Sequence, residues 1–224
     1  MSEVAELSAG GPELVFAEPG FEDLWAKLEG NDPERVALLT RTRTLGGPIY
    51  LVEMLGAEYL FNVPERRITG PRNRPAPDKR AALCLLNYLA GAREGEAGGR
   101  MVPETVLPGG ERFFTGGHAL TRKPILDKFG RDGAALLDRA RALGAEIIDG
   151  QGDGFSFRLN LLPRIAVQVT LSEDDDEFPA EVYYAFDASA ADLVPLGILS
   201  ALITQLNTLL VTAVEAAQLR GKGS

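Results

Sequence analysis

The residues best placed to do chemistry lie between positions 116 and 123, where a Gly-Gly turn leads into the start of an expected helix. Backbone N–H groups at such a turn and at a helix N-terminus, together with two cations, suit a phosphate or carboxylate group. We therefore hypothesise an anion-binding site made by Gly116, Gly117, His118, Arg122 and Lys123. The alternative is a common glycine turn whose histidine caps or packs locally.

An enzyme is a second hypothesis, with a site built from carboxylates and arginines around His118, Arg122 and Asp187. Such chemistry requires only that the partners meet in space, so sequence spacing does not exclude it. Asp187 lies after an expected strand and close to Ser189, which is also typical of a helix N-cap. A deep pocket with a perturbed carboxylate would favour the enzyme, and a flat uncharged patch would favour a binding domain.

Soft metal ligands are scarce, because the chain has one cysteine, one histidine and three methionines. Cys84 lies within a leucine-rich run and is expected to be a small buried hydrophobe. The acidic run from Asp174 to Glu177 could attract a cation, but it lacks the spacing and the glycine of a calcium loop. A solvated loop that blocks sheet pairing explains it equally well. We therefore expect no cofactor and no transition metal.

The formal net charge of −9 argues against nucleic acid as a partner, because phosphate binding needs a basic field. The basic cluster between Arg66 and Arg80 can bind an anionic partner or pair with the chain's own acids, and internal pairing is the preferred interpretation. The first residues are acidic and lack the basic and apolar regions of a signal peptide. These features predict a cytoplasmic protein without membrane attachment.

The chain is organised around an uncharged stretch from Leu193 to Val214, which we interpret as the main core helix. One face is aliphatic, and the other is polar without Lys, Arg, Asp or Glu. Solvated faces normally collect charges, whereas interface cores exclude them. We therefore hypothesise that this face is covered by a second copy of the chain or by N-terminal segments. The proposed interface residues are Ser200, Thr204, Asn207, Thr208 and Thr212.

Hydrophobic periodicity predicts an α+β fold in which an antiparallel sheet packs against the long C-terminal helix and several shorter helices. The sheet combines a C-terminal four-strand meander with an N-terminal hairpin. We expect mobile residues at 1–18, one domain over 19–218 and a mobile tail at 219–224. The meander strands are expected at 146–149, 154–159, 164–171 and 180–186, and the hairpin strands at 49–55 and 58–63.

The remaining segments are assigned by their turn and capping residues. Shorter helices are expected at 19–29, 78–90, 123–129 and 132–143, with left-handed C-caps at Gly130 and Gly144. Residues 35–43 form a short helix or a strand, residues 64–77 a linker, 101–107 an extended segment, and 111–115 a short strand.

Several turns and strand entries resemble the family called domain of unknown function 3786, found in bacteria and archaea. The match covers about 19–210 and is best from Asp176 to Ala180, then from Phe186 to Ala190 and from Leu193 to Pro195. The segments 107–110, 116–118, 128–130 and 162–164 agree with it as well. The family has no established activity, so no site residue is carried over.

Some of these relatives carry an additional cysteine-rich segment that resembles a four-iron, four-sulfur cluster domain. The resemblance therefore implies a redox or corrinoid setting. This chain departs from those relatives, because Cys84 alone cannot hold a cluster. Our leading expectation is a non-catalytic binding or accessory domain that acts through a protein partner or through self-association.

Overall fold

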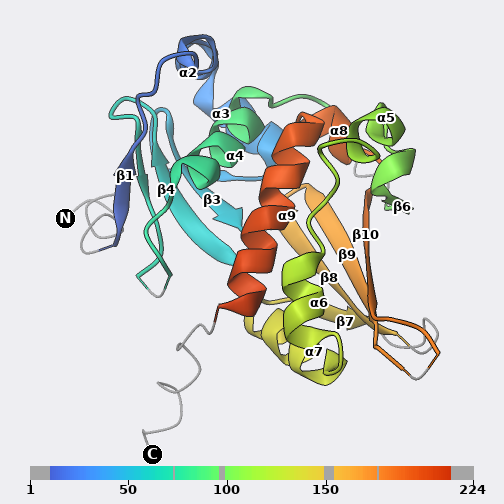
Figure 1. The fold of residues 1–224 in the computed structure, drawn as a ribbon. Coiled ribbons are helices and arrows are strands. Elements are labelled where there is room, and N and C mark those ends of the chain that lie inside the picture. The colour runs from blue at the N-terminus through green and yellow to red at the C-terminus, as the bar shows by residue number, and fades with distance from the viewer. Residues whose placement is uncertain (1–10, 73, 96–98, 149–153, 176, 213–224) are drawn as a thin grey trace, which may run out of the picture.

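A computed structural model describes residues 11–72, 74–95, 99–148, 154–175 and 177–212. These residues form two antiparallel five-stranded sheets with helices packed on them (Figure 1). The fold is therefore α+β, as predicted. The first sheet contains, in spatial order, β1 (Glu13–Val15), β5 (Arg67–Thr69), β4 (Ala57–Asn62), β3 (Ile49–Met54) and β2 (Arg43–Thr44).

The second sheet holds the predicted meander, with each strand paired to the next along the chain. Its order is β6 (Met101–Pro103), β10 (Glu181–Asp187), β9 (Ile165–Ser172), β8 (Phe155–Leu162) and β7 (Glu146–Ile148). Side chains alternate along these strands, so every second residue enters the core. In β9 the fully buried residues are Ile165, Val167, Val169 and Leu171.

The helices lie between and around the two sheets. They are α2 (Glu22–Gly30), α3 (Pro33–Thr40), α4 (Lys79–Ala90), α5 (Gly110–Phe114), α6 (Lys123–Phe129), α7 (Gly133–Ala142), α8 (Ala190–Leu193) and α9 (Leu196–Val211). A 3-10 turn, η1 (Glu104–Val106), follows β6. Asp78 caps α4, because its carboxylate accepts a hydrogen bond from the backbone N–H of Ala81.

The C-terminal helix α9 lies between α4 and α6, and the strands β8, β9 and β10 lie behind it and to its right in Figure 1. Its aliphatic side is fully buried at Leu199, Leu202, Ile203 and Leu206. Burying one such side chain contributes about 2 kcal/mol. None of the described helices is both long and apolar enough to cross a bilayer.

Three expectations about the sheets and the segments beside them need correction. The N-terminal hairpin does not join the meander but forms the centre of its own sheet, which meets the other where the Leu55 N–H donates to the Leu161 carbonyl. The expected linker at 64–77 contains β5, and the expected mobile residues 1–18 contain β1, which pairs with it. These three-residue strands are too short to show a period. Residues 1–10 and 219–224 lie outside the described residues.

The segment expected as a strand at 111–115 is instead the helix α5. Gly109 has a φ of +74°, and a Cβ on Gly110 would lie 2.1 Å from the Glu104 carbonyl oxygen. This tight turn starts a helix and buries Phe114. The predicted left-handed cap at Gly144 is confirmed by its φ of +84°, whereas Gly130 has a right-handed φ of −58°.

Candidate functional site

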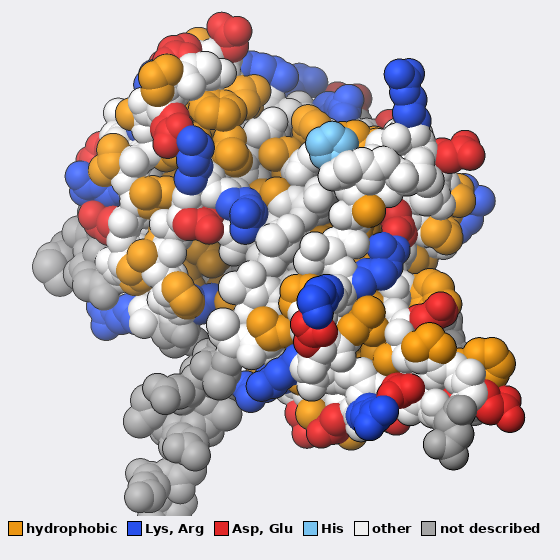
Figure 2. All heavy atoms as spheres, viewed as in Figure 1, with side chains coloured by type: hydrophobic (Ala, Val, Ile, Leu, Met, Phe, Trp, Pro, Cys, Tyr) orange, Lys and Arg blue, Asp and Glu red, His pale blue; other side chains and the backbone are white. Residues whose placement is uncertain are grey.

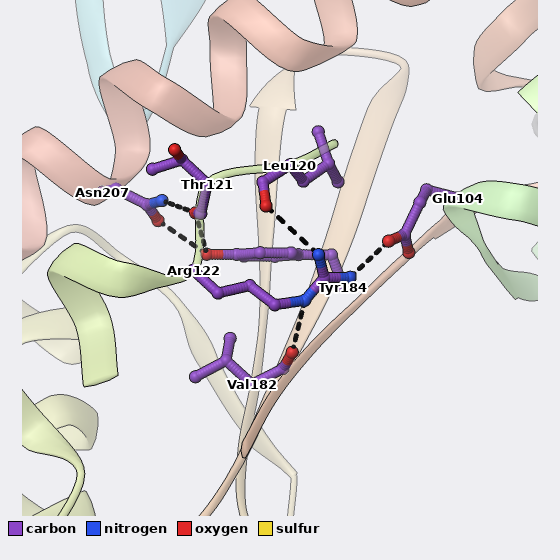
Figure 3. Close-up of polar contacts among 7 residues, drawn as sticks. All are labelled: Glu104, Leu120, Thr121, Arg122, Val182, Tyr184 and Asn207. Carbon is purple, nitrogen blue, oxygen red and sulfur yellow. Dashed lines mark hydrogen bonds and ion pairs between the residues drawn. The ribbon is translucent and has the colours of Figure 1, made fainter. Parts of the chain in front are cut away.

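The two sites inferred from the sequence meet at one buried residue, Tyr184 of β10. Arg122, from the hypothesised anion site, lies over the Tyr184 ring with its guanidinium carbon 5.6 Å from the ring centroid. Asn207, from the hypothesised interface, accepts a hydrogen bond of 2.9 Å from the Tyr184 hydroxyl. Figure 3 shows both side chains turned toward the tyrosine.

The Arg122 guanidinium is engaged by three acceptors of the protein itself. Its Nε donates to the Val182 carbonyl at 2.8 Å, and its Nη1 donates to the Leu120 carbonyl at 3.1 Å. Its Nη2 forms an ion pair with Glu104. The carboxylate side chain is only 10% exposed, while the arginine side chain remains 32% exposed. Charge-assisted hydrogen bonds of this kind are stronger than neutral ones, so the guanidinium is fixed in place.

Asn207 joins α9 to the segment before α6. Its amide nitrogen donates to the Thr121 carbonyl at 2.6 Å, while its amide oxygen accepts from the Tyr184 hydroxyl. Burial raises the pKa of Tyr184 to about 12, so the phenol stays protonated and acts as a donor at neutral pH. The network therefore connects β10, α9, η1 and the 120–122 segment through satisfied polar groups.

The other residues of the hypothesised anion site lie at the surface. Gly116, Gly117 and His118 are exposed, and the imidazole stacks on the Phe113 ring at a centroid distance of 4.5 Å. Lys123 pairs with Asp127 one turn along α6, with N–O distances of 2.7 and 2.9 Å. Arg122 points away from this group, so the anion site stays a prediction for the remaining four residues.

The outer face of α9 has an unusual chemical character. The hydroxyls of Thr204, Thr208 and Thr212 donate to the carbonyls four residues earlier, at 3.0, 2.9 and 2.6 Å. A hydroxyl bonded back to its own helix leaves the methyl group to face outward. Thr208 and Thr212 are exposed, and Ser200 and Thr204 are half-buried. The surface over α9 is largely white in Figure 2, with charged side chains to either side.

Asp187 lies apart from Arg122. Arg122 packs on Tyr184, whereas the two-residue alternation of β10 places Asp187 on the same side as Tyr183, where Asp187 itself is buried. Asp187 is also five residues beyond Val182, about 17 Å along the strand. Its carboxylate accepts from the Ser189 backbone N–H at 2.9 Å and from the Gly99 N–H at 2.7 Å. This pattern fits a turn that leads into α8.

The basic cluster from Arg66 to Arg80 is largely paired within the chain. Arg67 lies 3.3 Å from a Glu65 oxygen, and Arg66 stacks over Trp25 at 5.5 Å.

The acidic loop from Asp174 to Glu177 also makes contacts within the chain. Asp174 pairs with Arg131, and Asp175 accepts from two backbone N–H groups of its own loop. Asp176 lies outside the described residues, among which no three His, Cys, Asp or Glu side chains form a metal-binding group.

One buried arginine was missed by the sequence analysis. Arg164 is 6% exposed, and its guanidinium donates to the carbonyls of Leu39 at 2.6 Å and Arg93 at 2.8 Å, and to Gly95. The sequence placed Arg164 on the partly solvated side of a strand. Its three acceptors come from segments 69 to 125 positions earlier in the chain, so no local pattern indicates them.

The described residues thus form an α+β fold of two antiparallel five-stranded sheets, with the Tyr184 network connecting the second sheet to the C-terminal helix α9. The chain belongs to the family described as domain of unknown function DUF3786, whose model matches residues 32–207. No curated protein and no solved structure matches the chain.

Proposed function

We propose that this protein is a non-catalytic binding or accessory domain that acts through the outer face of α9. The observation that carries the proposal is that the hydroxyls of Thr204, Thr208 and Thr212 donate to backbone carbonyls of their own helix. The outer surface formed by Ser200, Thr204, Thr208 and Thr212 offers methyl groups and no charge. Such a surface costs little to desolvate, which suits a protein interface.

The geometry also favours this function over a carboxylate and arginine enzyme. A catalytic arginine needs donors free to meet a substrate, but Arg122 donates to Val182, Leu120 and Glu104. Asp187 lies on the opposite side of β10 and organises the turn before α8. Burial raises the pKa of Cys84 to about 12, which disfavours the reactive thiolate.

The partner is either a second copy of the chain or another protein, and the family resemblance favours a redox or corrinoid protein. Any cluster or corrinoid chemistry then belongs to the partner, since this chain has one cysteine and it is buried. Isolation of the native protein with its associated components tests this part of the proposal. Co-isolation of an iron–sulfur or corrinoid protein that is lost in the α9 variants Thr204→Lys and Thr208→Glu supports the proposal. Co-isolation that is unchanged in these variants opposes it.

Light scattering tests the α9 face directly. Thr204→Lys and Thr208→Glu place charges on this surface, so each should weaken a dimer or the capture of the partner by at least tenfold while the fold is retained. Thr115→Lys is the matched control, because Thr115 also donates to the carbonyl four residues earlier but lies at the C-terminal end of α5. If all three variants bind like the wild type, the α9 face is not the interface.

A further inference from the structure

Strand β10 is only half-paired on its outer edge. On one side it pairs with β9 from Glu181 to Phe186. On the other side β6 pairs only with Ala185, Phe186 and Asp187. In the described chain, the segment Glu181–Tyr184 therefore has a strand neighbour on one side alone, and this part of β10 forms the right-hand edge of the sheet in Figure 1.

The direction of the backbone groups along this edge follows from the register. In an antiparallel pair, alternate residues direct their N–H and C=O groups toward one neighbour and then toward the other. The Val182 carbonyl accepts from the Arg122 side chain, so its polar groups face away from β9. Two-residue periodicity assigns the same direction to Tyr184 and to Phe186, whose register partner on this side is Val102 of β6.

An unpaired strand edge can accept a strand from another chain, and proteins often block such edges with charged side chains. Here Arg122 crosses the Tyr184 ring, donates to the Val182 carbonyl and ends on Glu104 of η1 (Figure 3). We infer that the Arg122–Glu104 pair is an edge cap, which keeps this half of β10 closed to a further strand.

The strand excluded by the cap is β10 of a second copy. Two antiparallel β10 strands related by a twofold axis at Tyr183 would place Val182 opposite Tyr184 of the other copy. Both are residues whose backbone groups point outward, so the pair can exchange hydrogen bonds. Tyr183, whose side chain is 52% exposed, would then face its own equivalent, and cross-strand aromatic pairs stabilise sheets. This contact is independent of the α9 face.

The experiment compares the self-association of Arg122→Met with that of Arg164→Met. Both variants remove an arginine that binds backbone carbonyls, but Arg164 contacts Leu39, Arg93 and Gly95 rather than β10. Removing the cap should raise the weight-average mass above that of the wild type as concentration rises, by up to a factor of two. Hydrogen exchange should show new protection of the Val182 and Tyr184 amides. Arg164→Met should remain in the wild-type state.

Three further variants separate an edge contact from general unfolding. Glu104→Gln weakens the cap while Arg122 is kept, so it should also associate, and it replaces Arg122→Met if that variant does not fold. Arg122→Lys keeps a charge on the edge and should stay in the wild-type state. Adding Tyr183→Lys should reverse the association. If neither Arg122→Met nor Glu104→Gln associates more than Arg164→Met, the edge cap is refuted. The association of Arg122→Met should persist when Thr204→Lys is added to it, which distinguishes the β10 contact from the α9 interface.

Discussion

Arg122 and Arg164 have the same chemistry and different surroundings. Arg164 is 6% exposed, and its described acceptors are backbone carbonyls from the N-terminal half of the chain. Arg122 is held by one carboxylate and two carbonyls, and its side chain keeps a 32% exposed fraction. Arg164 thus joins α3 to the segment that follows α4 inside the fold, whereas Arg122 covers a strand edge at the surface.

The difference shows how an acidic chain uses its few cations. A buried guanidinium satisfies several carbonyls that would otherwise be left without donors. The two arginines should therefore differ in stability and in association, with Arg164 dominating stability and Arg122 controlling the edge of β10. Substitutions in and around the two arginines test this difference.

The largest effect is expected for Arg164→Met. The substitution leaves the carbonyls of Leu39, Arg93 and Gly95 without their donor, so the free energy of unfolding should fall by about 3 kcal/mol. For Arg122→Met the free energy of unfolding should fall by about 2 kcal/mol, because the Arg122 side chain is more exposed to solvent. Urea unfolding measures both values. The contrast fails if Arg122→Met is the more destabilised of the two.

Asn207→Leu should have an intermediate effect. It removes one of the two acceptors of the Tyr184 hydroxyl, the other being the Thr121 carbonyl at 3.3 Å. It also removes the donor to that carbonyl, and together these losses should cost about 1.5 kcal/mol. Gln205→Leu is the control on the same helix, since it removes only an exposed hydrogen bond of 2.7 Å to Asp78. Its loss should be about 0.5 kcal/mol. Equal losses would mean that the Tyr184 network contributes nothing beyond a surface contact.

Among the substitutions in the Tyr184 network, the smallest effect at neutral pH is expected for Tyr184→Phe, about 1 kcal/mol. Its signature is pH dependence. Burial raises the pKa of Tyr184 to about 12, from about 10 in an unfolded chain, so the folded state favours the protonated phenol. This stabilisation is complete below pH 10 and is lost as pH rises through 12. Between pH 9 and 12 the free energy of unfolding should therefore decline less steeply with pH in Tyr184→Phe than in the wild type. Identical slopes in the two proteins would contradict the raised pKa of Tyr184.

Much of the fold could be predicted because its long elements have clear periods. The alternation in β9 and the aliphatic side of α9 correctly located the main sheet and its covering helix. The separate N-terminal sheet could not be foreseen, because β1, β2 and β5 have only two or three residues each. The helix α5 is fixed by a tight turn at Gly109 and Gly110 rather than by a repeating pattern.

The candidate sites were harder to predict, because the direction of a polar side chain depends on distant partners. Arg122 was grouped with its sequence neighbours, yet its acceptors include Glu104, 18 positions earlier, and Val182, 60 positions later. Asn207 was grouped with surface threonines but reaches Thr121, 86 positions away. Arg122 and Asn207 are polar residues with exposed polar neighbours in the sequence. Residue type alone does not show which polar side chains point into the fold.

Arg122 serves the fold and not a ligand, and the Nε–H of its side chain reports on this directly. A two-dimensional proton–nitrogen spectrum, assigned by the signal lost in Arg122→Lys, can follow this group with and without phosphate. The hydrogen bond to Val182 predicts a slowly exchanging Nε–H signal that does not move on phosphate addition. A rapidly exchanging signal, or one that shifts as phosphate is added, would contradict the account.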